Sequence, residues 1–474
     1  MIKKLYRWIE KLSPNKLIVF LTLIYSPSIL GFFASDDWYH LNVSNITSFR
    51  EFFNFFSLTP TTQSTPFYRP ISTQSFFFIL HKLFGLQPQI FYLTVLLLFF
   101  INLSLLHRLL KKLTPNKLFQ NLSLIIYGLS VSNFTRLYFI SASQETTVAI
   151  FVLLTLFVYL RRTKKSYFSS LALFVLALMS KENAIVIPGL IFLLDWYQQK
   201  LNLKRLVPFM VIGLFYLYFR VIPSLTLPGQ TYHLDFSPSK LANTLLWYGL
   251  WQVGAPELLI DYIGSGLRPI PRLYTDYPFF SYLILALLIV LGVTISYSLF
   301  INRKKLNKLT AFSTFFATIG ILPVAFLPDH KYAFETAIPL IGVSVFLAQI
   351  LSIKKRSAAI ALIVFITLNL SMHYLTYTRH YSVKRAKLSH KVYNYLADKY
   401  PVCPLDGEFY FLDPTPEPEP FKDYARQISY AISDSNMLQV VCKNPNLVTH
   451  FSEDDPISSN KTPIKIPSKM FFVP

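Results

Sequence analysis

Long apolar runs without charge alternate with short polar connectors along most of the chain. Uncharged stretches include Phe91 to Leu106, Tyr282 to Ile295 and Ala358 to Leu370. A helix of about 20 residues crosses the hydrocarbon core of a bilayer, where backbone amides must be paired within the segment. Because the runs show no alternation of period two, they predict helices rather than barrel strands. The pattern therefore predicts an all-α polytopic membrane protein.

Lysine and arginine concentrate in the connectors and give the chain a formal net charge of +21. Such clusters mark the cytoplasmic side of a membrane protein, so the charge indicates topology rather than nucleic-acid binding. The basic clusters lie at 3–16, 108–117, 161–165, 200–205, 303–308 and 354–356. The spans that place every cluster inside are 17–34, 89–107, 118–135, 142–160, 167–180, 184–197, 206–223, 279–301, 310–327, 333–351 and 357–376. This path of about 11 helices predicts a cytoplasmic N-terminus and an extracytoplasmic C-terminus.

Two segments decide the topology. Residues 167–197 are interrupted by Lys181 and Glu182, and a single span there would move the basic cluster at 200–205 to the outer side. We therefore expect a helical hairpin. The stretch Leu241 to Ile260 is apolar enough to enter the membrane, but a full crossing would move the cluster at 303–308 outside. We expect an outer-surface or re-entrant helix there.

The predicted outer surface begins with a long first loop, Ser35 to Pro88. Its segment Ile71 to Phe84 is short and contains polar residues, which predicts an amphipathic helix at the membrane interface. The first apolar run lacks a small-residue cleavage site at its outer end, so we expect it to be retained as a span.

The region after the last span is polar and is predicted to be extracytoplasmic. It holds both cysteines, Cys403 and Cys442; a disulfide is permitted outside the cytoplasm, although their spacing does not show one. The run Pro414 to Pro420 is typical of a stiff linker. We divide the chain into a transmembrane domain, 1–378, and a small extracytoplasmic region, 379–474.

Two adjacent carboxylates, Asp36 and Asp37, follow the first predicted span. Ionised side chains at a membrane boundary are costly and commonly functional, because they bind a hydroxyl, a cation or a proton in transit. The alternative is that the pair caps or solvates a helix end.

Further charged residues reach the same outer surface on this topology, namely Glu145, Glu182, Arg69, Lys181 and Lys331. A carboxylate can orient or deprotonate an attacking hydroxyl, while cations neutralise a departing phosphate. This combination fits transfer of a sugar from a lipid phosphate. Each residue also has a structural alternative. Arg69 would be an interfacial residue whose charged end reaches water, and Lys181 and Glu182 would form an ion pair with each other that closes the turn.

Several short motifs occur in one order along residues 15–375. They are Asp36-Asp37, Phe67-Tyr68-Arg69-Pro70 with the segment 72–85, Ser180–Pro188, Ala255–Tyr262 and His330-Lys331-Tyr332. In these motifs the chain resembles the glycosyltransferase C superfamily, and within it the protein O-mannosyltransferase-like enzymes. The resemblance implies a bundle of about 11 transmembrane helices with a long first external loop.

The resemblance also implies an inverting transfer of a hexose, mannose-like, from a polyprenyl-phosphate donor to a protein, lipid or glycan acceptor. By position, Asp36 or Asp37 is the expected base. Arg69, Lys181 and Lys331 are expected to bind the donor phosphate. Lys331 departs from the arginine expected in that turn, and a lysine lacks bidentate geometry.

Four other residues of these loops are expected to support the site or to contact the acceptor: Tyr68, Glu145, Glu182 and His330. His40, His81 and His330 show no metal-ligand spacing. Two carboxylates can hold a divalent cation, but several cations are available to neutralise a monophosphate, so we expect a metal-independent reaction without a cofactor.

Other functional classes stay open from the sequence. A lipid-linked glycan flippase or transporter would carry charges deep within its spans and paired halves with broken helices. A polysaccharide polymerase or ligase would use a lipid-diphosphate donor, and an assembly protein would tolerate replacement of both aspartates. The expected partners are the donor lipid, membrane lipids and the acceptor.

Overall fold

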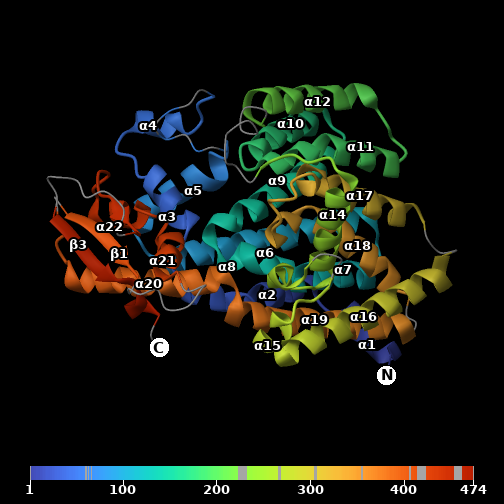
Figure 1. The fold of residues 1–474 in the computed structure, drawn as a ribbon. Helices are drawn as coiled ribbons and strands as arrows, with labels where there is room; N and C mark the ends of the chain where they lie inside the picture. The colour runs from blue at the N-terminus through green and yellow to red at the C-terminus, as the bar shows by residue number, and fades with distance from the viewer. Residues whose placement is uncertain are drawn as a thin grey trace.

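Helices dominate the computed structural model, as Figure 1 shows. The structure describes residues 2–58, 61, 63, 65, 67–221, 232–264, 268–303, 307–353, 356–404, 407–413, 423–452 and 462–472. The predicted linker 414–420 and the basic residues Lys304, Lys305, Lys354 and Lys355 lie outside these ranges.

Each predicted span after the first coincides largely with a helix, whereas the first, 17–34, contains only the end of α2 and the short turn η1 (Ser26–Leu30). The helices are α2 (Pro14–Leu23), α6 (Pro88–Leu113), α7 (Lys117–Leu129), α9 (Ser143–Tyr159), α10 (Lys164–Leu178), α11 (Ile187–Tyr197), α12 (Leu203–Tyr216), α16 (Pro278–Asn302), α17 (Lys308–Ala325), α18 (Pro339–Leu351) and α19 (Arg356–Arg379). The amphipathic α1 (Ile2–Lys11) precedes them. Proline in the first turn begins α2, α6, α16 and α18, where its missing N–H costs no helical hydrogen bond.

Five helical segments of the described chain are long and apolar enough to cross a membrane. They are 88–113, 140–159, 278–301, 308–325 and 356–399. On α16, Ile289 and Val293 are more than half exposed, as lipid-facing side chains are. The predicted helical, polytopic membrane fold is confirmed for the part of the chain before the C-terminal region.

The predicted helical hairpin at 167–197 is also confirmed. Arg162, just before α10, forms an ion pair with Asp195 near the end of α11. The Tyr167 hydroxyl donates to the backbone oxygen of Arg205, which begins α12, at 3.0 Å. The start of α10 therefore lies beside the end of α11, and Lys181 lies in the turn at the opposite end of the hairpin.

Short helices form the connections that surround the site. The first loop contains α3 (Asp36–Val43), α4 (Phe49–Asn54), the π-helical turn η2 (Ile71–Ser75) and α5 (Phe76–Phe84). The later connections contain η7 (Glu257–Tyr262), α15 (Arg272–Asp276) and η10 (Ala333–Ala337). The remaining turns are η1 (Ser26–Leu30), η3 (Val131–Asn133), α8 (Phe134–Tyr138), η4 (Ile140–Ala142), η5 (Glu182–Val186) and η6 (Leu217–Val221).

The stretch expected to lie at the outer surface, Leu241 to Ile260, forms most of α14 (Pro238–Val253) and the start of the turn η7. Its Tyr248 hydroxyl donates to the backbone oxygen of His330 at 3.4 Å, and its Asn243 accepts a bond from Lys331 at 2.8 Å. The helix therefore lies against the turn at 328–332.

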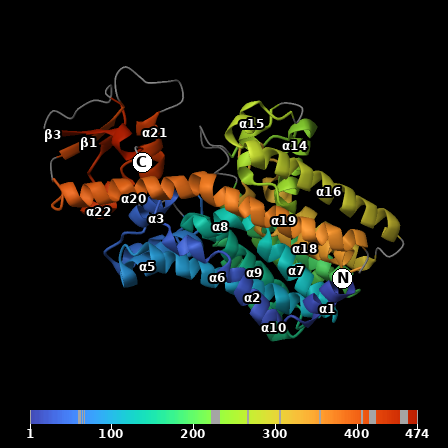
Figure 2. The ribbon, with the colours of Figure 1, turned by 90° about the horizontal axis from the view of Figure 1, so that it is seen from below.

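The region after α19 folds as a small α/β unit, which we call the C-terminal unit (the described part of 381–472). It consists of α20 (Tyr381–Lys399), β1 (Gly407–Leu412), α21 (Tyr424–Ile432), α22 (Asn436–Cys442), β2 (Thr449–His450), β3 (Thr462–Pro467) and η11 (Ser468–Phe471). The strands are parallel in the order β2-β1-β3, a small sheet that the all-α expectation did not include. Figure 2 shows α20 continuing beyond α19 to this unit.

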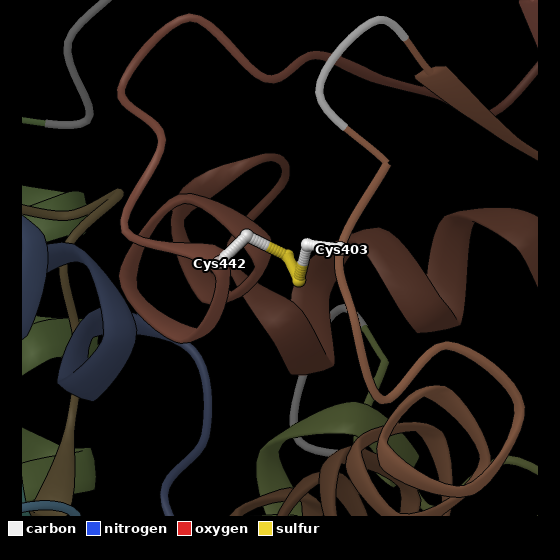
Figure 3. Close-up of a disulfide and its surroundings, with 2 residues drawn as sticks. All are labelled: Cys403 and Cys442. Atoms are coloured by element: carbon white, nitrogen blue, oxygen red, sulfur yellow. A yellow bond between two sulfur atoms is a disulfide. The ribbon is translucent and has the colours of Figure 1, made fainter.

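Cys403 and Cys442 form a disulfide within the C-terminal unit, with their Cα atoms 5.6 Å apart (Figure 3). The bond joins the segment after α20 to the end of α22. It supplies the pairing that the spacing of the cysteines left open.

Candidate active site

A cavity of about 1130 Å³ opens where the first loop, η7, the turn at 328–335 and the start of α20 meet. Its walls carry charged and aromatic side chains together. The charged residues are Asp36, Glu257, Asp261, Asp329, Glu335, Arg69, Lys181, Arg272, Lys331, Arg379, Lys384 and Arg385, and three histidines, His40, His330 and His380, lie among them. A cavity of this size holds a ligand as large as a sugar phosphate.

Helix α3 presents three different faces to its surroundings, as the 3.6-residue repeat requires. Asp36, Tyr39 and His40 line the cavity. Asp37 and Leu41 are fully buried. The third face, with Ser35 just before the helix, Trp38 and Asn42, forms hydrogen bonds with the C-terminal unit.

Asp36 is exposed to the cavity and forms no hydrogen bond or ion pair with any other described residue. The surrounding protein raises the pKa of the Asp36 carboxyl above its ordinary value, because it replaces water around the group. Arg385, and to a smaller extent Arg69, lower this pKa. Asp36 is therefore a carboxylate that lies near cations. Its oxygens remain available to a ligand.

Asp37, in contrast, has its oxygens occupied. Its Oδ1 accepts bonds from the backbone N–H and the hydroxyl of Ser141 at 2.8 and 2.5 Å, and its Oδ2 accepts the Ala34 N–H at 3.1 Å. Burial raises the pKa of Asp37 to about 7, and these hydrogen bonds oppose the rise. Asp37 thus joins the first loop to the start of α9.

Arg69 forms a two-pronged ion pair with Glu182: its Nε donates to Oε2 at 2.8 Å and its Nη2 contacts Oε1. Its Nη1 donates to Gln144 Oε1 at 2.9 Å. The guanidinium lies at the cavity wall, where Phe67 covers it with its ring centroid 4.7 Å away. Its charge is already balanced by Glu182.

Lys181 is also at the wall but is almost completely buried between two carboxylates. Its Nζ donates to Glu335 Oε1 at 2.9 Å and forms an ion pair with Glu145. Asn183 donates to Glu335 Oε2 at 2.7 Å. Burial lowers the pKa of Lys181, and Glu335 opposes this change. Lys181 and Glu182 therefore pair with distant partners rather than with each other.

The remaining predicted residues divide between the cavity wall and its surroundings. Lys331 lines the cavity and donates to Asn243. His330 also lines it, with its Nε2 3.3 Å from Glu335 Oε1 and its ring against Tyr232. Tyr68 donates from its hydroxyl to the Phe56 backbone oxygen at 3.1 Å, within the first loop.

Sequence reasoning missed the cations of the α19–α20 junction: Arg379, Lys384 and Arg385 line the cavity. The Arg385 guanidinium lies over the rings of Tyr381 and Tyr430, 5.0 and 4.9 Å from their centroids. None of these cations has a carboxylate partner among the described residues. Their sequence signal is a basic stretch directly after the last predicted span, within the region predicted to be extracytoplasmic.

Among the described residues, the cavity thus combines Asp36, whose carboxylate accepts no hydrogen bond, with several cations that form no ion pair. Among the residues that the structure describes, no group of three His, Cys, Asp or Glu side chains is arranged to hold a metal ion. Such a site can bind an anionic ligand through the cations while the carboxylate accepts a proton or a hydroxyl group.

Comparison with known proteins gives little further guidance. No protein-family model and no curated protein matches the chain. Among solved structures, it is similar to ArnT from Cupriavidus metallidurans bound to undecaprenyl phosphate, with 14% identity over 92% of this chain and 89% of that chain. The TM-score is 0.34, too low to argue function from the superposition.

Proposed function

We propose that this protein is a membrane glycosyltransferase of the C type that transfers a hexose from a polyprenyl-phosphate donor to a hydroxyl acceptor. The observation that carries the proposal is Asp36, whose carboxylate accepts no hydrogen bond from any residue that the structure describes and which shares one cavity with Lys331, Arg379, Lys384 and Arg385. A displacement reaction with an anionic leaving group needs a base and cations within reach of one bound substrate.

In the proposed reaction, the acceptor hydroxyl oxygen attacks the anomeric carbon of the hexose. The bond from that carbon to the phosphate oxygen breaks, and the hydroxyl proton passes to the Asp36 carboxylate. The polyprenyl phosphate leaves with the bonding electron pair, and the anomeric configuration inverts because the hydroxyl attacks the face opposite to the phosphate. Arg385 and Lys384 neutralise the charge that develops on the leaving phosphate.

Arg69 and Lys181 have a different place in this proposal. Both are balanced by buried carboxylates, so we assign them to holding the cavity wall rather than to neutralising the phosphate. Lys331 donates to the neutral Asn243, forms no ion pair with a described residue and stays a candidate phosphate ligand. The other carboxylates support the site without touching the substrate: Asp37 binds Ser141, Glu145 pairs with Lys181, and Glu182 pairs with Arg69.

We place the cavity on the outer face of the cytoplasmic membrane. The positive-inside pattern of the connectors supports this orientation. The disulfide in the C-terminal unit, which borders the cavity, supports it independently, because disulfides persist in oxidising compartments. A mannose-like sugar and a protein, lipid or glycan acceptor are the proposed substrates.

The test is sugar transfer by the purified full-length protein from a panel of radiolabelled polyprenyl-phosphate hexoses. We expect turnover with at least one donor and a loss of about 10²- to 10⁴-fold in Asp36→Asn. Asp398→Asn is the matched control, because Asp398 is exposed near the end of α20 and does not line the cavity.

Full activity of Asp36→Asn would remove Asp36 from the chemistry. Turnover only with lipid-diphosphate donors would indicate a polymerase or ligase. No turnover with any donor, together with movement of a labelled glycan lipid across reconstituted vesicles, would establish a transporter instead.

A further inference from the structure

We propose that Ser35 is a positioning residue of this active site and that the C-terminal unit holds it in place. The inference rests on the proposed function, since it assigns Asp36 as the base. It concerns a part of the chain that is separated from the first loop by almost the whole sequence.

Ser35 has an unusual backbone conformation directly before Asp36, with φ at 51° and ψ at −127°. Residues with a side chain rarely adopt a positive φ, and they do so where the surroundings compensate the strain. Both compensating bonds come from the C-terminal unit: the Ser35 N–H donates to the Ala431 oxygen at 2.9 Å and its hydroxyl to the Tyr430 oxygen at 2.7 Å.

The same face of α3 is attached to the C-terminal unit at two further points. The Trp38 indole N–H donates to the Ser389 hydroxyl at 2.9 Å. The Asn42 amide donates to Asn436 Oδ1 at 2.8 Å and to Gln439 Oε1 at 2.6 Å. Figure 1 shows α3 beside α21 and α22. The unit therefore holds the start, the middle and the end of the helix that carries Asp36.

Tyr430 links the two sides of the cavity. Its backbone oxygen accepts the Ser35 hydroxyl, and its ring lies under the Arg385 guanidinium, 4.9 Å from the centroid. Tyr430 thus contacts both the residue that precedes the proposed base and Arg385, the cation proposed to neutralise the leaving phosphate. The separation between Asp36 and Arg385 is consequently set by the C-terminal unit as well as by the membrane bundle.

The test compares Ser35→Ala and Ser35→Gly with the wild-type protein. Both variants lose the hydroxyl bond, but glycine adopts a positive φ without strain and keeps its N–H for Ala431. We expect kcat to fall about 10-fold or more in Ser35→Ala, less in Ser35→Gly, and the donor KM to stay nearly constant. Ser48→Ala is the matched control, because Ser48 caps α4 in the same loop through hydrogen bonds with Glu51.

Hydrogen exchange supplies a readout that does not need activity. We expect the backbone amides of residues 36–43 to exchange faster in Ser35→Ala than in the wild type. In Ser48→Ala, we expect faster exchange in α4 and unchanged exchange in α3. Wild-type kcat in Ser35→Ala, an equal loss in Ser48→Ala, or unchanged exchange across α3 would overturn the positioning role. If α3 exchange rises while the wild type shows no turnover with any donor, the attachment of α3 stands and the proposed function fails.

Discussion

Asp36 and Asp37 are adjacent in sequence, yet the first lines the cavity and the second is fully buried with its Oδ1 2.8 Å from the Ser141 nitrogen. Successive residues of a helix point about 100° apart, so α3 necessarily separates the two carboxylates. The pair therefore does not act as one unit, and the two residues can be distinguished by substitution.

Replacing each aspartate by asparagine should give different defects. Asp36→Asn should fold normally and lose turnover, because it removes the proposed base. Asp37→Asn should lower the free energy of unfolding by about 1–3 kcal/mol, because an amide N–H₂ cannot accept all the bonds from Ser141 and Ala34. Thermal unfolding in detergent and the transfer assay separate the effects. Normal stability with abolished turnover in Asp37→Asn would contradict this division.

The pH dependence of turnover should report the ionisation of Asp36. A base must be deprotonated, so kcat should fall as the pH decreases through its pKa, and this pKa is raised above that of a free aspartate by burial. Arg385→Gln removes the cation that lowers the pKa most, so the acidic limb should move to higher pH. Lys399→Gln, an exposed change on the same helix, should leave the profile unchanged. A limb that moves downward in Arg385→Gln would refute the assignment.

Lys181→Met should destabilise the protein strongly. The substitution leaves Glu145 and Glu335 buried without their cation, which typically costs about 3–5 kcal/mol. Its control is Lys240→Met, which removes an exposed ion pair with Asp235 and should leave the melting temperature unchanged. Equal melting temperatures for the two variants would show that the buried cluster does not stabilise the fold.

Removal of the disulfide should loosen the C-terminal unit. Cys442→Ser should reduce its stability by about 2–4 kcal/mol, because a cross-link restricts the unfolded chain. The same variant leaves Cys403 as the one thiol of the chain, so a membrane-impermeant maleimide tests the topology. Labelling of intact cells would support an external C-terminal unit, and labelling only after permeabilisation would reverse the proposed orientation.

Turnover should persist in the presence of a chelator such as EDTA. The reaction as proposed neutralises the leaving phosphate with Arg385 and Lys384, which needs no divalent ion. The measurement is the rate of sugar transfer during a chelator titration. Loss of turnover that added magnesium or manganese restores would show that the reaction requires a metal ion.

The membrane fold was largely predictable, because apolar runs and basic connectors are local signals. The turn at Lys181 and Glu182 was expected from two charges inside an apolar stretch, and the ion pair of Arg162 with Asp195 confirms the resulting hairpin. The two aspartates after the first predicted span also indicated a site in the sequence. Asp36 lies in the cavity, where the proposed base must be.

The composition of the cavity was less predictable, because it depends on contacts between distant segments. Lys181 was expected to face a ligand, but its position between Glu145 and Glu335 depends on packing that no local pattern encodes. Arg385 was assigned to an external tail, since nothing in its neighbourhood indicates that α20 continues to the first loop. The small parallel sheet was missed for a related reason: its strands are short and far apart in sequence.

The attachment of α3 to the C-terminal unit has a consequence for how the protein is made. Ser35 and Tyr430 are separated by 395 residues, and β1 pairs with β3 at 462–467. The first loop is translated early, but the residues that hold α3 follow it by almost 400 residues. A nascent chain therefore passes through a long stage in which α3 lacks these partners and the cavity is not yet assembled.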